Sequence, residues 1–143
     1  MPMLELTSPP PPYIVSMISQ GIAHENELSS VARYDFAIVE REGDAIIGGV
    51  TASISFAALF INNIWVERHA RGRGVGRALV TAAEAEGVRL GATMGCVDTL
   101  STQAPYFYAS LGYSEFGRLE GWVDGNAVDR IWFRRPLRSH ALA

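Results

Sequence analysis

The spacing of hydrophobic residues divides this 143-residue chain into segments of helical and of strand-like periodicity. Across 13–30, apolar side chains recur at helical spacing, which predicts one helix or two short ones. Apolar runs then predict three strands joined by short turns, one of them the tight turn "EGD" at 42–44. These strands are expected at 36–41, 45–55 and 58–66.

The second half of the chain repeats the alternation of helix and strand. The alanine-rich segment 76–91 favours a helix, and the apolar run 92–100 reads as a buried strand. A short helix is expected at 103–113, followed by two closing strands, 114–125 and 127–137, around the turn "VDGN". The order predicts a mixed α/β (α+β) fold that combines antiparallel pairs with one β–α–β crossover.

Length and composition favour one globular domain over 13–143, preceded by an extended lead-in at 1–12 that contains "SPPPP". A net charge of −3 argues against nonspecific binding to nucleic acid. The longest apolar run, 45–61, holds too many small polar residues for a membrane span. The single cysteine excludes an internal disulfide and fits a reducing cytoplasm, and we expect no signal peptide.

The stretch "ERHARGRGVGRALV" (67–80) places four arginines and three glycines at the start of the predicted helix 76–91. A helix start offers unpaired N–H groups and the positive end of the helix dipole, so anions bind there. Arginines add charge-assisted bonds to phosphate. The candidate phosphate ligands are Arg71, Gly72, Arg73, Gly74, Val75, Gly76 and Arg77. A basic surface loop is the alternative interpretation.

Two familiar phosphate cradles do not fit these glycines. A P-loop requires a lysine that is absent here, and the dinucleotide fingerprint lacks its last glycine and follows the wrong strand. The pattern R-x-x-G-x-G, met by Arg71, Gly74 and Gly76, resembles the coenzyme A loop of the GCN5-related N-acetyltransferase (GNAT) family. "NIWVERHARGRGVGRALV" and "APYFYASLGYSEFG" resemble two signatures of that family in the correct order, and the resemblance extends over 13–137. "VDTLSTQAPYFYASLGYSEFGRLEGW" resembles its small bacterial members.

The resemblance implies a three-layer fold with a central mixed, mostly antiparallel sheet between flanking helices. Its two parallel strands, here 58–66 and 92–100, would splay apart at mid-sheet and admit acetyl-CoA. Backbone groups of Ile64, Trp65 and Val66 would pair with the pantetheine amides, as an added strand pairs with a sheet edge. Ser101, Gln103 and Tyr108 are further cofactor contacts on this view, and Ser101 stands where the family often has an asparagine.

The implied reaction needs a proton acceptor and a proton donor. A primary amine must lose its proton before it attacks, and the departing thiolate must gain one. By motif position Tyr108 is the candidate acid, although it could instead only pack beneath the cofactor. Strand alternation is expected to place Phe60, Asn62, Ile64 and Val66 on one face, where the family often carries a glutamate. Asp98 is the nearest candidate base, with a loop-capping role as the alternative.

Asn62, Asp98 and Trp122 are the candidate residues for the acceptor. Asn62 has no basic group, but it can hold a water molecule or hydrogen-bond the acceptor. Core packing or a dimer contact is the alternative role for Trp122. A further set of acidic side chains could attract a cationic amine: Asp98, Glu115, Glu120 and Asp124.

The sequence therefore predicts an acetyl-CoA-dependent N-acetyltransferase that acts on a small-molecule amine by direct attack in a ternary complex. Two alternatives stay open: an acyl-CoA sensor without turnover, and an acetyltransferase for protein amines. The three histidines lie too far apart in sequence to suggest a metal site. We expect no metal, nucleic-acid or membrane partner, a possible homodimer, and a cytoplasmic location.

Overall fold

The structure, a computed structural model, describes residues 1–25 and 33–138. The chain forms two compact units, Met1–Ala32 and Arg33–Ala143, and each is described by itself. In the first, an extended segment leads into α1 (Pro12–Glu25). A proline suits a helix start because the first turn needs no N–H from it. The rest of the predicted helix, 26–30, lies outside the described residues.

The second unit begins with an antiparallel meander of three strands, as predicted. These are β1 (Tyr34–Glu42), β2 (Ala45–Ser55) and β3 (Ala58–Val66). Helix α2 (Val75–Arg89) then crosses from β3 to the parallel strand β4 (Met94–Leu100). The bounds of β2 and β3 coincide with those expected from the hydrophobic pattern.

The remaining elements complete a six-stranded sheet in the order β1-β2-β3-β4-β8-β5. They are α3 (Pro105–Ser110), β5 (Ser114–Leu119) and β8 (Arg130–Pro136). Strand β8 lies between β4 and β5 and is antiparallel to both.

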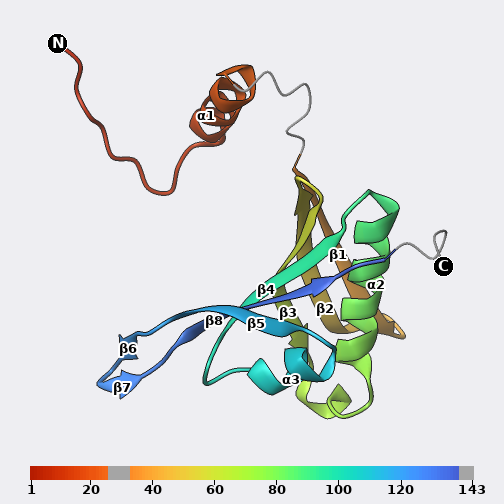
Figure 1. The fold of residues 1–143 in the computed structure, drawn as a ribbon. Helices are drawn as coiled ribbons and strands as arrows, with labels where there is room; N and C mark the ends of the chain where they lie inside the picture. The colour runs from red at the N-terminus through yellow and green to blue at the C-terminus, as the bar shows by residue number, and fades with distance from the viewer. Residues whose placement is uncertain (26–32, 139–143) are drawn as a thin grey trace. The chain divides into compact units, whose positions relative to one another are not determined.

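A small two-stranded sheet connects β5 to β8. It consists of β6 (Trp122–Val123) and β7 (Asn126–Ala127), and Figure 1 shows it as an arm that extends away from the main sheet. The turn between these strands has positive φ angles at Asp124 and Gly125, as a tight hairpin turn requires. The turn predicted at "VDGN" is therefore confirmed.

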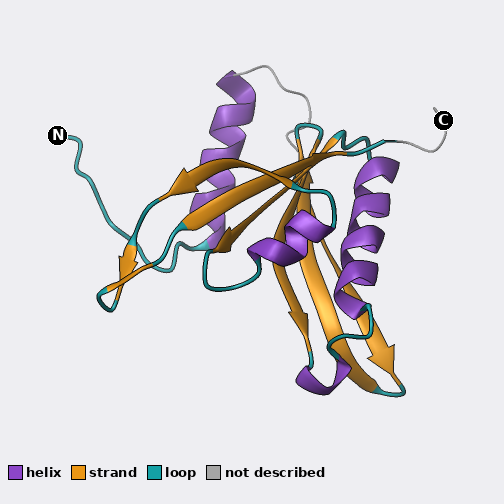
Figure 2. Ribbon diagram, turned by 60° about the horizontal axis from the view of Figure 1, so that its bottom comes forward, coloured by secondary structure: helices purple, strands orange, loops and turns teal. Residues whose placement is uncertain are grey.

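The sheet opens between its two parallel strands. Ala58–Ile61 of β3 pair with Met94–Val97 of β4, and the pairing ends there. Strand β8 nevertheless stays paired with β4 along its whole length. Figure 2 shows the result, with β1, β2 and β3 diverging from β4, β8 and β5. The predicted fold class, a mixed sheet with splayed parallel strands and flanking helices, is confirmed.

Helices α2 and α3 lie on the same face of the sheet. Tyr108 of α3 belongs to the same buried cluster as Leu79 and Val80 of α2. A second, smaller cluster lies under the C-terminal part of α2, where a Cβ at Gly87 would approach Leu59 to 3.3 Å. The two clusters bury the apolar side chains that the strands direct toward the helices.

A β-bulge interrupts β3 beside the point where the sheet opens. Across the β2–β3 pair, Ala52 lies opposite Ile61 whereas Thr51 lies opposite Asn63. Asn62 is therefore the extra residue. Such a bulge bends the strand and changes which face later side chains occupy.

The bulge corrects one expectation from the sequence. Phe60 and Asn62 do lie on the face away from α2, but Ile64 and Val66 pack against the main buried cluster together with Ile61. The prediction that all four side chains share a face was wrong for Ile64 and Val66. The expectation assumed that side chains alternate between the two faces along an uninterrupted strand. One extra residue in the strand exchanges the faces of all side chains that follow it.

Substitution of Leu59 tests how much the smaller cluster contributes to stability, because the Leu59 side chain is 0% exposed and packs beneath α2. We expect Leu59→Ala to lower the free energy of unfolding by about 3 kcal/mol, the usual cost of a cavity at a buried leucine. Denaturant unfolding followed by circular dichroism measures this change.

Leu119→Ala is the matched control, because Leu119 is 61% exposed on the edge strand β5. That variant should stay within about 0.5 kcal/mol of the wild-type free energy. Equal losses for the two variants would contradict the packing described above.

Candidate functional site

Two positions in the loop between β3 and α2 have backbone conformations that only glycine adopts easily. It begins with a single 3-10 turn (Arg68–Ala70), after which Gly72 and Gly74 have φ angles of 76° and 82°. Side chains with a Cβ rarely adopt such angles. Gly74 directly precedes α2 and provides no side chain to cap it.

The first turn of α2 presents unpaired donors to this loop. The backbone bond from Ala78 N–H to the Gly74 carbonyl, at 3.0 Å, is the first of the helix. The N–H groups of Val75, Gly76 and Arg77 come before it and have no acceptor within the helix. The first turn also carries no acidic side chain. These groups fit the pyrophosphate of coenzyme A.

Gly76 has a second role that the sequence did not reveal. A Cβ there would lie 3.2 Å from the ring of Phe107. Helix α3 therefore packs closely against the start of α2, and a side chain at position 76 would force the ring of Phe107 to shift by a few tenths of an ångström. The contact holds α3, and with it Tyr108, beside the glycine loop.

Two of the three arginines in the loop already have protein partners. Arg71 donates through Nε to the Val66 carbonyl at 3.0 Å, so it supports the end of β3. Arg73 forms an ion pair with Glu42 at 3.1 Å. Both side chains keep other N–H groups that could reach an anion. Their roles as phosphate ligands stay predictions.

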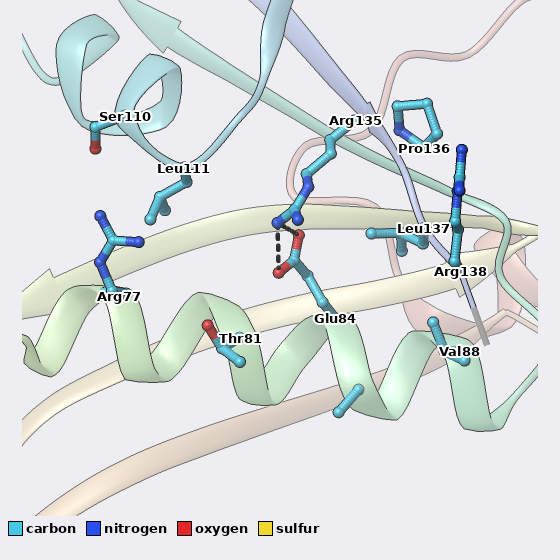
Figure 3. Close-up of a pocket in the computed structure, with 11 residues that line it drawn as sticks. Arg77, Thr81, Glu84, Val88, Ser110, Leu111, Arg135, Pro136, Leu137 and Arg138 are labelled. Atoms are coloured by element: carbon cyan, nitrogen blue, oxygen red, sulfur yellow. Dashed lines mark hydrogen bonds and ion pairs between the residues drawn. The ribbon is translucent and has the colours of Figure 1, made fainter. Parts of the chain in front are cut away.

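A cavity of about 650 Å³ lies on the α2 side of the sheet, and its lining comes from α2, the end of α3 and β8 (Figure 3). Arg77, in the first turn of α2, lines one end of it. On its wall, Arg135 pairs with Glu84 at 3.2 Å, and Glu84 accepts a hydrogen bond from the Tyr113 hydroxyl at 2.9 Å. Burial, followed by the charge of Glu84, raises the pKa of Tyr113, so its phenol stays a donor.

Asn62 and Asp98 occupy the first positions after the last β3–β4 pair, Ile61 with Val97. Asn62 Nδ2 donates to the buried Ser53 hydroxyl at 3.4 Å. Asp98 lies opposite Trp132 of β8, on the face away from α2. The structure therefore brings Asn62 and Asp98, both predicted to contact the acceptor amine, to the edge of the same opening.

Tyr108 is 4% exposed and packs edge-on against the rings of Phe107 and Tyr113. Burial raises the pKa of Tyr108 to about 12, and the nearby charge of Asp98 adds to the rise. Among the described residues, no protein group hydrogen-bonds its hydroxyl, and no fully enclosed side-chain N or O atom lacks a partner. The hydroxyl therefore keeps some exposure to solvent and stays a protonated donor.

Ser101 and Gln103 are engaged in closing the end of β4. The Ser101 hydroxyl oxygen accepts from the Asp129 N–H at 3.0 Å, and Gln103 Oε1 accepts from the Leu100 N–H at 3.3 Å. Their contacts with a cofactor stay predictions. Trp122 is 75% exposed on β6, and the structure does not bring it to the opening.

Sequence reasoning missed Arg130, which lies diagonally across the β4–β8 pair from Asp98, two residues from its direct partner Trp132. The two side chains form an ion pair, with 3.6 Å between Arg130 Nη1 and Asp98 Oδ2. Only the register of these strands, which are distant in sequence, could have revealed this neighbour.

Residues 32–115 match the family model described as an acetyltransferase (GNAT) domain. The chain thus belongs to the GNAT family, and the resemblance seen in the sequence is confirmed. Blasticidin-S acetyltransferase of Streptomyces morookaense is 36% identical over 76 residues, which cover 50% of this chain and 54% of that protein. The match thus spans about half the length of this curated relative.

Solved structures agree with the fold. An acetyltransferase from Bacillus cereus ATCC 14579 has a TM-score of 0.74 at 25% identity, over 93% of this chain and 98% of that one. A Bacillus anthracis protein assigned as a streptothricin acetyltransferase was solved in complex with acetyl coenzyme A. Its TM-score is 0.67 at 18% identity, over 78% of this chain and 67% of its own.

Two further observations concern residues 1–25 and 33–138. No helix there combines the length and the apolar character needed to cross a membrane. In the same part of the chain, no three His, Cys, Asp or Glu side chains gather as metal ligands do.

Gly74→Glu tests the phosphate loop. A carboxylate beside the first turn of α2 should repel the pyrophosphate and accept hydrogen bonds from the N–H groups of that turn. We expect coenzyme A affinity, measured by calorimetry, to fall by about 10- to 100-fold, on the order of 1.4–2.8 kcal/mol.

Gly125→Glu controls for backbone strain. Gly125 has φ of 78°, close to the 82° of Gly74, and an added Cβ meets nothing within 4 Å at either position. Its turn lies on the β6–β7 arm, so coenzyme A affinity should not change. Equal losses of coenzyme A affinity in the two variants would show that backbone strain, and not the carboxylate in the loop, causes the loss.

Proposed function

We propose that this chain transfers an acetyl group from acetyl-CoA to a primary amine of a small molecule. The observation that carries the proposal is the opening between β3 and β4, which has the glycine loop after β3 and Asp98 at the first unpaired position of β4. Tyr108, whose pKa the charge of Asp98 helps to raise, would lie beside it. A donor held by the loop and an acceptor entering from the open face would meet at this opening.

The loop and the strand beyond it would hold the donor. Residues 71–77 would bind the pyrophosphate through the N–H groups at the start of α2. Past Ile61, β3 has no partner on its β4 side, so backbone groups of Ile64, Trp65 and Val66 can pair with amides of an extended ligand. Bound acetyl-CoA supplies an acetyl group activated as a thioester.

The cavity beside Arg77 suits the nucleotide end of the same donor. Besides Arg77 it holds Arg135 and Arg138, against the one carboxylate of Glu84. Since Arg135 is paired with Glu84, the remaining positive charge favours phosphate groups.

The acceptor amine would lose its proton to Asp98, directly or through a water molecule held by Asn62. Tyr108, kept protonated by its raised pKa, would donate to the departing sulfur. This division uses a buried phenol as the acid and an exposed carboxylate as the base. A catalytic role for either residue is part of the proposal.

The relatives point toward a small antibiotic-like amine. One is named for blasticidin S, and another is assigned to streptothricin. Two expectations from the sequence, a homodimer and a cytoplasmic location, stay predictions.

Release of free thiol from acetyl-CoA tests the proposal. The purified chain is incubated with acetyl-CoA and a panel of small amines, nucleoside antibiotics and peptides with free amino groups. Thiol release with a small amine supports the proposal. Thermal stabilisation by coenzyme A without turnover would favour an acyl-CoA sensor, and activity confined to peptides would favour a protein-amine acetyltransferase.

Tyr108→Phe tests the acid. Removal of the hydroxyl should lower kcat by about 100-fold or more, the usual contribution of general acid catalysis, without loss of coenzyme A affinity. Tyr106→Phe is the control, because Tyr106 is exposed on the same helix and should keep full activity.

The pH dependence follows from the raised pKa of Tyr108. With a pKa of about 12, the phenol stays protonated up to about pH 10, so it should cause no loss of rate there. The kcat ratio of wild type to Tyr108→Phe should therefore stay constant between about pH 7 and pH 10. A ratio that falls across this range would contradict the buried donor.

A further inference from the structure

The open face of the sheet carries mixed charge where β3 and β4 separate. Asp98 of β4 contributes one carboxylate. Arg130 of β8 contributes a guanidinium group beside it. Arg134 contributes a second one farther along β8, opposite the part of β4 that is still paired with β3. The cross-strand partners are Leu100 with Arg130 and Cys96 with Arg134, so these side chains share the face of Asp98.

Contacts support these positions. Arg130 Nη1 lies 3.6 Å from Asp98 Oδ2, and the two side chains are 53% and 45% exposed. The guanidinium of Arg134 lies 5.5 Å from the ring centre of Phe116. Arg134 is the cross-strand partner of Cys96, and its charge opposes the rise that burial causes in the pKa of the Cys96 thiol.

Three other acidic side chains near the sheet already have basic partners. Glu115 lies opposite the buried Phe133, hence on the α2 face, where it pairs with Arg118. Asp129 pairs with Arg118 as well. Asp35 shares the open face, but it lies on the edge strand β1 and pairs with Arg33 at 2.8 Å. A cationic acceptor would therefore meet Arg130 directly beside the carboxylate of Asp98 at the opening.

The pair of Asp98 with Arg130 is loose. At 3.6 Å it is longer than the 2.7–2.9 Å typical of a charge-assisted hydrogen bond, and both groups remain open to solvent. Exposed pairs of this kind contribute little to stability. A ligand with one positive and one negative group can replace the pair with two shorter contacts.

We propose that the acceptor is an amine that carries a carboxylate a few bonds away, as amino acids and their conjugates do. This inference rests on the proposed function. Asp98 binds the ammonium group, and Arg130 binds the carboxylate, for which its planar fork is well suited. Arg130 is thus a specificity-determining residue that orients the amine toward the opening.

The protons and bonds balance in this arrangement. The bound ammonium gives one proton to Asp98, which passes it to solvent. The free amine then forms the C–N bond at the thioester carbon, and the C–S bond breaks. The sulfur takes the Tyr108 proton, and the second proton lost by the nitrogen restores the phenol.

Matched acceptors test the inference. The panel pairs amino acids with their primary amides, which keep the amine and lack the carboxylate. Rates of thiol release are compared over a pH series, so that kcat/KM is expressed per free amine. The wild type should prefer each acid over its amide by at least about 10-fold, the worth of one charge-assisted contact.

Arg130→Gln should bring the ratio of kcat/KM for each acid to that for its amide close to one. The change should come mainly from a higher KM for the acids, with little change in kcat/KM for the amides. Arg130→Lys should restore part of the preference, because it keeps the charge but loses the fork. Arg118→Gln is the control, since Arg118 is paired on the opposite face, and it should keep the wild-type preference. Thermal unfolding of each variant verifies that it is folded.

The outcomes separate the two proposals. A wild type that prefers the amides, or diamines without a carboxylate, overturns the inference and leaves the acetyltransferase proposal standing. An acid preference that survives Arg130→Gln in a folded variant also overturns it. If no amine of any kind releases thiol, both proposals fail.

Discussion

Hydrogen bonding that stops between two parallel strands underlies every other feature of this site. After Ile61 and Val97, the facing edges of β3 and β4 no longer satisfy each other's backbone groups. Unpaired N–H and C=O groups need other partners, and an extended ligand can provide them. Both edges stay rigid, because β2 continues to hold β3 and β8 continues to hold β4. The bulge at Asn62 lies at the first open position and bends β3 there.

Packing between helices brings Tyr108 close to the start of α2. The bare Gly76 lets Phe107 approach the first turn of α2, so that α3 packs beside the glycine loop. Tyr108 lies in the core, and burial keeps it protonated. Asp98, at the first unpaired position of β4, is exposed and ion-paired. The environments of these two groups thus differ in the way that the proposed roles of acid and base require.

Local patterns in the sequence predicted most of the fold. The hydrophobic periodicity located β2, β3 and α2 to within one or two residues, because each period depends only on near neighbours. The same reasoning failed at Asn62, since a bulge depends on how β2 pairs with β3. It named Arg71 and Arg73 as candidate phosphate ligands, but it did not reveal their protein partners, the Val66 carbonyl and Glu42, because no sequence pattern encodes these contacts.

The sequence by itself determined the order of the elements, the glycine-rich turn before α2 and membership of the GNAT family. The first two depend on short-range preferences, such as the positive φ angles that favour glycine at positions 72 and 74, whereas the family was recognised from the resemblance of its motifs. Only the tertiary structure decided where β3 and β4 part, which face carries Asp98, and that Arg130 lies beside it. Those features depend on the register between strands far apart in the chain, which is set by the packing of the whole sheet.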